Sequence, residues 1–187
     1  MKRLLKGLSL STAAFVALSA MPVQAGPSGY KPINAPMRLT LNLYQCPDPG
    51  PVLSWTGTVV IDGQTYGWAD VALTDPDSPP PPQPNDNFLP FEENWTIFTL
   101  HEGEDPHTEP WLACDDSRVV LAGDNTGWVN RPFTGKAEGE VGYAAGPFAD
   151  LELGSRMFWN GKALGSSAAD PCCVPGVSVW KATLHIN

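Results

Sequence analysis

Two adjacent carboxylates, Glu92 and Glu93, are the residues of this chain whose position best suits proton transfer. They directly precede an expected strand over 94–100, and neighbouring residues of a strand point to opposite faces. One of them could therefore point into a barrel interior, where burial raises the pKa of a carboxyl and equips it as an acid or base. The sequence favours the simpler interpretation, two exposed carboxylates at the end of a proline-rich loop. Opposite faces also exclude a glycosidase pair, whose carboxyls must face one substrate.

The histidines give little indication of a metal or catalytic site. His185 falls on the polar side of an expected last strand, which predicts a solvated side chain. His101 and His107 flank the acidic segment 102–105, and oxygen ligands with imidazole could bind a divalent cation. Their spacing matches no ligand pattern, so we expect a solvated acidic turn and no metal.

Other motifs for chemistry are incomplete. Segments 75–77 and 85–87 resemble calcium loops in composition, but they lack the glycine and the closing glutamate of such loops. Ser155 lies outside any Gly-x-Ser-x-Gly pattern, and 161–167 does not end in Gly-Lys-Ser/Thr. We therefore expect no catalytic set of these kinds and no cofactor.

The first 25 residues read as a secretory signal peptide with a basic start, an apolar stretch and a small-x-small cleavage site. Their removal leaves 26–187 as one domain and takes the net charge from −9 to −12. Such acidity argues against nucleic acid and anionic lipid as partners. The rest of the chain has no apolar run long enough to span a bilayer. We expect a secreted or periplasmic soluble protein, of an oligomeric state that the sequence leaves open.

Four cysteines remain after the signal, and an even number in an exported chain predicts disulfides rather than a metal site. Three pairings are possible. A bond between adjacent cysteines requires a strained ring, so we expect Cys46 and Cys114 each to bond one member of the Cys172–Cys173 pair.

Two-residue alternation of apolar and polar residues recurs along the chain and predicts antiparallel strands. About eight strands indicate a closed barrel, with a β-sandwich as the alternative. The leader 26–36 and the proline-rich loop 75–90 are expected to be irregular, and turns are expected at 62–63, 123–127 and 160–161. The expected strands cover 37–43, 53–61, 65–73, 94–100, 117–122, 128–130, 136–143, 149–159 and 180–186.

Aromatic residues are the best candidates for binding. Trp55, Trp95, Trp159 and Trp180 fall on apolar strand faces, which predicts core packing and permits an aromatic-lined cavity. The face taken by Tyr66 and Trp68 is left open, and an exposed pair would suit sugar stacking. The candidate ligand-binding residues are Trp55, Tyr66, Trp68, Glu93, Trp95, Tyr143 and Trp159.

Several segments together resemble the small barrels of the allene oxide cyclase and dirigent type. These segments are Gly57–Val59, Asp62–Gly67, Phe91–Ile97 and Gly139–Tyr143. The resemblance covers about two-thirds of the mature chain and consists mostly of turn and strand patterns. It implies an eight-stranded barrel with an apolar cavity, in families that include a fatty-acid-derived cyclase and proteins that guide coupling reactions. No functional residue of those families maps onto a matching position here.

The sequence thus predicts an exported, non-enzymatic barrel that binds a small apolar ligand or serves as a structural or interaction module. One alternative is an isomerase or cyclase on the same scaffold, with Glu92 or Glu93 transferring a proton. The other is a carbohydrate-binding sandwich with a row of exposed aromatic rings.

Overall fold

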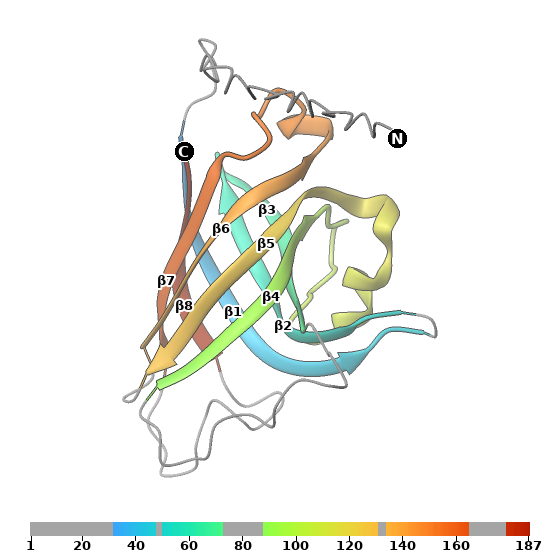
Figure 1. Ribbon diagram of the computed structural model, residues 1–187. Coiled ribbons are helices and arrows are strands. Elements are labelled where there is room, and N and C mark those ends of the chain that lie inside the picture. Colours follow the sequence, from blue (N-terminus) through green and yellow to red (C-terminus); the bar gives the residue numbers. More distant parts are fainter. Residues whose placement is uncertain (1–31, 48–49, 73–87, 131–133, 165–178) are drawn as a thin grey trace, which may run out of the picture.

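The chain folds into a closed β-barrel (Figure 1). The structure is a computed structural model that describes residues 32–47, 50–72, 88–130, 134–164 and 179–187. Each strand pairs antiparallel with the next, and β8 closes the barrel on β1. The expected fold class is confirmed, and the sandwich alternative is wrong because closure leaves no sheet edge. The strands are β1 (Ile33–Gln45), β2 (Val52–Ile61), β3 (Gln64–Ala72), β4 (Phe88–Phe98), β5 (Val119–Asn130), β6 (Thr134–Ala144), β7 (Arg156–Leu164) and β8 (Val179–Ile186).

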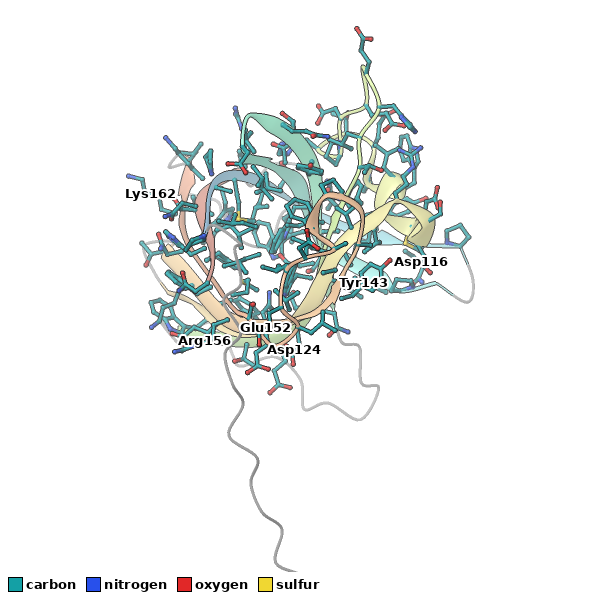
Figure 2. All side chains as sticks on the ribbon, turned by 90° about the horizontal axis from the view of Figure 1, so that it is seen from above. Asp116, Asp124, Tyr143, Glu152, Arg156 and Lys162 are labelled. Atoms are coloured by element: carbon teal, nitrogen blue, oxygen red, sulfur yellow. A yellow bond between two sulfur atoms is a disulfide. The ribbon has the colours of Figure 1, made fainter. Side chains whose placement is uncertain are left out.

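The two-residue alternation of the sequence becomes an inside and an outside of the barrel. In β1, Met37 and Leu39 are buried while Arg38 between them is exposed. The same alternation in β8 buries Trp180 and Leu184. Seen from above, side chains fill the ring of strands (Figure 2).

The turn predicted at 62–63 is confirmed. Asp62 and Gly63 both have positive φ, 49° and 83°. This is the backbone that a two-residue hairpin requires, and it joins β2 to β3.

Two strands extend into proline-containing segments that the sequence predicts to be irregular. β1 includes Pro36 and β4 includes Pro90. Among the described residues, Pro36 is paired only with β8 and Pro90 only with β5. The prediction is wrong at these positions because a proline that needs no donor on its second side can occupy a strand. The part of the proline-rich loop over 73–87 lies outside the described residues.

The glycine-rich segment 123–127, predicted to be a turn, lies in the middle of β5. A Cβ at Gly123 would clash with the carbonyl oxygen of Glu140 on β6, so close backbone approach requires glycine there. Asn125, between the glycines, is 2% exposed and points into the barrel. The prediction is wrong because glycine in a strand also marks the close approach of a neighbour.

Two predictions around β7 are also wrong. Residues 149–153 form a turn after the short 3₁₀ helix η3 (Gly146–Phe148) instead of a strand. Phe148 and Leu151 are buried there and join the main core. The segment 160–161, predicted as a hairpin, lies inside β7, where Gly161 faces Ala182 of β8 at close range. A short stretch of alternating residues can also form a turn, and a pair of turn residues can also lie within a strand, so neither pattern alone predicts the structure here.

Residues 99–118, here named the strap, connect β4 to β5 across the outside of the barrel (Figure 1). The strap contains the 3₁₀ helices η1 (Pro110–Cys114) and η2 (Asp116–Arg118), and η1 lies against β1, β2 and β3. The hydroxyl of Thr56 donates to the carbonyl of Pro106 over 2.6 Å, and Asn42 donates to the carbonyl of His107. A second buried cluster forms beneath the strap from Cys46, Leu53, Ala69, Phe98 and Leu112.

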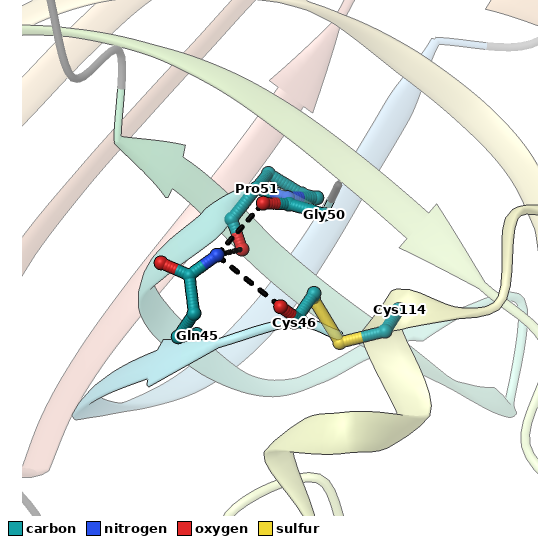
Figure 3. The surroundings of a disulfide bond; sticks show 5 residues. All are labelled: Gln45, Cys46, Gly50, Pro51 and Cys114. Carbon is teal, nitrogen blue, oxygen red and sulfur yellow. Dashed lines mark hydrogen bonds between the residues drawn. A yellow bond between two sulfur atoms is a disulfide. The ribbon is translucent and has the colours of Figure 1, made fainter. Parts of the chain in front are cut away.

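The strap is fastened by a disulfide between Cys46 and Cys114 (Figure 3). The pairing expected from the sequence, in which each of these bonds one member of the Cys172–Cys173 pair, is therefore wrong. The reason is tertiary: the strap folds back over β1 and brings the two Cα atoms to 5.6 Å, although 68 positions separate them in sequence. Cys172 and Cys173 lie outside the described residues.

The predicted signal peptide over 1–25 also lies outside the described residues. In the part of the chain that the structure describes, no helix has the length and apolar character needed to cross a membrane.

Candidate functional site

Four neighbouring strands each contribute one buried polar side chain to the interior of the barrel. Asp70 on β3 and Glu93 on β4 are 1% and 8% exposed, and Asn125 on β5 lies directly opposite Glu93. Ser54 on β2 completes the group. We name these four residues the inner polar cluster. Glu92, the neighbour of Glu93, is exposed, as the opposite faces of a strand require.

A β-bulge brings Ser54 to this cluster. The register of β2 against β3 shifts between Leu53 and Trp55, which leaves Ser54 as the extra residue. Its hydroxyl donates to the Oε1 atom of Glu93 over 2.7 Å. Trp55, the next residue, packs against the main core. The bulge therefore gives β2 a polar and an aromatic contribution to the interior from consecutive residues.

Asp70 is held by two donors. The indole Nε1 of Trp68 donates to its Oδ2 atom over 2.9 Å, and the Nδ2 atom of Asn125 donates to its Oδ1 atom over 3.2 Å. The ring of Trp68 is stacked on that of Trp95, with centroids 5.4 Å apart and planes within 3°. The carboxylate is thus fixed between an aromatic stack and an amide.

Burial changes the acidity of both carboxyls. It raises the pKa of Glu93 to about 7, against the opposing effect of the Ser54 hydrogen bond. Burial, and then the charge of Glu93, raise the pKa of Asp70 well above its usual value, and the donors Trp68 and Asn125 oppose this. Two carboxyls this close in a dry interior do not both carry charge at neutral pH, so the pair retains a proton.

Aromatic rings fill the interior beside the inner polar cluster. Trp55 and Trp180 meet edge to face at 5.6 Å, and Phe91 is stacked on Trp159 at 6.1 Å. Between Leu39 and the three indoles remains a cavity of about 10 Å³. That is space for about one water molecule, so an organic ligand here requires an indole to move.

Two buried polar atoms near these rings lack a hydrogen-bond partner among the described residues. They are the Oδ1 acceptor of Asn125 and the Nε1 donor of Trp159. Trp159 is 5% exposed and lines the cavity, and Asn125 adjoins both carboxyls. Buried polar groups are normally satisfied, so this donor and this acceptor need hydrogen-bond partners that the described residues do not supply.

The structure brings together most of the candidate binding residues and separates one of them. Tyr143 lies outside, 48% exposed, because the register of β5 against β6 shifts beside Gly142 and turns the following residue outward. Tyr66 and Trp68, whose face the sequence leaves open, are buried, so they form no exposed sugar platform. The inward residues are Trp55, Tyr66, Trp68, Glu93, Trp95 and Trp159.

Sequence reasoning did not identify three members of the inner polar cluster. Asp70 follows Tyr66 and Trp68 at two-residue spacing, and this shared face was the available signal. The sequence predicts a turn at Asn125, which lies in β5, and only the bulge directs Ser54 inward. Pairing between strands, rather than any motif, assembles the site.

The histidines lie in different environments. His101 is exposed, and burial lowers the pKa of His107, which shares a hydrogen bond of 2.8 Å with the Thr40 hydroxyl. His185 stacks on Phe158 with ring centroids 4.3 Å apart. Among the described residues, no three His, Cys, Asp or Glu side chains gather closely enough to hold a metal ion. The calcium-like segments 75–77 and 85–87 lie outside these residues.

Comparison of the chain with protein-family models, curated proteins and solved structures finds no match. The resemblance to allene oxide cyclase and dirigent barrels therefore stays a prediction.

Proposed function

We propose that this barrel binds a small, largely apolar molecule that carries one polar group able to donate and accept hydrogen bonds. The observation that carries the proposal is the unpartnered pair of buried polar atoms, Asn125 Oδ1 and Trp159 Nε1, beside the buried carboxyls and the indole-lined cavity. The apolar body would lie among the indoles of Trp55, Trp159 and Trp180. The polar group would meet Asn125 and Glu93.

Ligand uptake requires part of the aromatic packing to open. Trp55 is the half-buried member of the cavity lining, whereas Trp159 and Trp180 are buried. The edge-to-face contact of Trp55 with Trp180 contributes about 1 kcal/mol of stability beyond the burial of the two rings. An aromatic ring of a ligand can replace this contact. The Cys46–Cys114 disulfide supports an oxidising compartment as the place of action.

The test measures the binding of N-phenyl-1-naphthylamine, an apolar aromatic amine with one N–H donor, through the fluorescence of this probe. We expect saturable binding that quenches tryptophan emission. Glu93→Met keeps the side-chain length but removes the carboxyl, and should weaken binding about tenfold. Glu92→Met is the matched control and should leave binding unchanged, since Glu92 is exposed.

Solvent extraction of the purified protein with mass spectrometry is the second measurement. A recovered apolar compound supports the proposal. The absence of both a recovered compound and saturable probe binding would overturn it, as would equal weakening by the two variants.

A second candidate, an isomerase or cyclase, is favoured by one observation. Burial raises the pKa of Glu93 to about 7, where a carboxyl can both accept and donate a proton at neutral pH. The recovered compound, incubated with protein in deuterated water, should gain deuterium with the wild type but not with Glu93→Gln. Equal deuterium content with both proteins would remove this candidate and leave the binding proposal intact.

A further inference from the structure

The outer wall of the barrel carries a row of cations that the interior site does not involve. Lys162 on β7 lies directly opposite Lys181 on β8, and Lys181 lies directly opposite Arg38 on β1. Lys136 on β6 lies beside this row, opposite Asn160. All four basic side chains are exposed, and together we name them the basic band.

In the described part of the chain, the basic band has no ion-pair partner. Among the described residues, the ion pairs involve Arg118 and Arg156, and the contact of Lys136 is with the ring of Trp128 at 5.6 Å. The closest acidic residue along β6, Glu138, pairs with Arg156. Like charges directly opposite on neighbouring strands destabilise a sheet, so this row costs stability.

The basic band is unexpected on this chain, because the whole sequence has a net negative charge. The sequence has 20 acidic and 11 basic residues, so a surface with randomly mixed charges would place acidic side chains among the basic ones. Instead, Lys162 lies on a different side of the barrel from Asp124 and Glu152 (Figure 2). The basic band is therefore a separate positive area on an acidic protein.

The three lysines line a shallow groove of about 530 Å³ together with neutral hydrogen-bonding residues. Thr134, Asn160 and Thr183 supply hydroxyl and amide donors, and the described residues of the lining include no acidic side chain. Ammonium groups act as point charges for phosphate, whereas planar carboxylate recognition usually relies on arginine. Strands lie about 4.8 Å apart, so successive cations can meet adjacent phosphate groups of one molecule.

We propose that the basic band binds a small molecule with two or three linked phosphate groups. A long polyanion is disfavoured because it would extend past the basic band over the acidic remainder of the surface. The screening length at physiological salt is about 8 Å, so the band attracts only the anionic groups close to it. This inference does not depend on the proposed function, because the groove is on the outside of β6, β7 and β8 and shares no side chain with the inner polar cluster.

The test is titration calorimetry of the full disulfide-bonded protein with tripolyphosphate in low salt. We expect one saturable site that weakens as salt increases. The double variant Lys162→Gln/Lys181→Gln should weaken it about tenfold or more. Arg156→Gln, which removes another exposed positive charge outside the groove, should change binding less than about twofold.

Citrate and a single-stranded oligonucleotide distinguish other anions. Both should bind more weakly than tripolyphosphate. Because the two lysines repel each other, the double variant should keep or raise the melting temperature in the absence of phosphate, which separates lost binding from misfolding. Equal weakening by Arg156→Gln, tighter binding of citrate or oligonucleotide, or no saturable binding would overturn the proposal.

Discussion

At the scale of the residue, Glu93 and Asp70 show how position changes chemistry. Glu92 and Glu93 are identical in type and adjacent in sequence, yet Glu92 is exposed to solvent and Glu93 is buried inside the barrel, with 8% of its surface exposed. Glu93 retains a proton to near-neutral pH because burial penalises its charged form. A second buried carboxyl beside it reinforces the need to share a proton.

This predicts a pH dependence of stability. In the unfolded chain Glu93 has a pKa near 4.5, and in the folded chain about 7. Between these values the folded chain holds a proton that the unfolded chain has lost, so the free energy of unfolding falls as pH rises through this window. The decrease attributable to Glu93 is on the order of 3 kcal/mol. Urea unfolding at pH 5 and pH 8 measures it.

Glu93→Gln should reduce this difference by the part that Glu93 contributes and leave the part due to buried Asp70, whereas Glu92→Gln should keep the whole difference. Equal pH dependence of the two variants would contradict the burial of a titrating Glu93.

At the scale of the element, β5 and the strap show two ways in which neighbours decide local structure. β5 continues through a segment with the composition of a turn because β6 approaches too closely for any side chain at Gly123. The strap, with little regular structure, keeps its place through hydrogen bonds to β1 and β2, the cluster beneath it and the Cys46–Cys114 bond.

Gly123→Ala should therefore destabilise the protein by about 1–3 kcal/mol, because the new Cβ meets backbone that has no room to move. Gly142→Ala is the control on the neighbouring strand, since a Cβ there would lie 3.9 Å from the carbonyl oxygen of Ala122 and from the Cα of Gly123. Chemical denaturation compares the two. A smaller loss for Gly123→Ala than for Gly142→Ala would contradict the close approach of β5 and β6.

Removal of the disulfide by Cys46→Ala/Cys114→Ala should lower the free energy of unfolding by about 4 kcal/mol in the loop-entropy treatment, given the separation of 68 positions. Amide hydrogen exchange should increase most within the strap, whose attachment is lost, and least in β6 to β8. Uniform exchange changes over all strands would argue against a strap that the bond specifically fastens.

At the scale of the whole molecule, closure of the barrel joins all eight strands around one main core. β8, at the end of the chain, contributes Trp180, Leu184 and Ile186 to the same interior as β1. Closure also creates the two surfaces on which the proposals rest, the dry inner wall with its carboxyls and the outer wall with the basic band.

Leu184→Ala should consequently destabilise the whole barrel by about 2–5 kcal/mol, because Leu184 is fully buried in the shared core. Leu153→Ala, at a leucine that is 60% exposed, should change stability by less than about 0.5 kcal/mol. Thermal unfolding followed by circular dichroism measures both, and similar effects of the two substitutions would contradict the assignment of the core.

The alternation of apolar and polar residues is enough to predict the fold class and the inward faces of most strands, because the two-residue period of a strand is local and survives in any antiparallel arrangement. Leu39, Trp95 and Leu184 could be assigned to the interior in this way, and Asp62-Gly63 to a hairpin. The tertiary structure alone decided where Asp70 and Asn125 meet Glu93, which cysteine bonds Cys46, and that Lys162, Lys181 and Arg38 form one row. Each of these depends on pairing between segments distant in sequence, where bulges and steric contacts set the register.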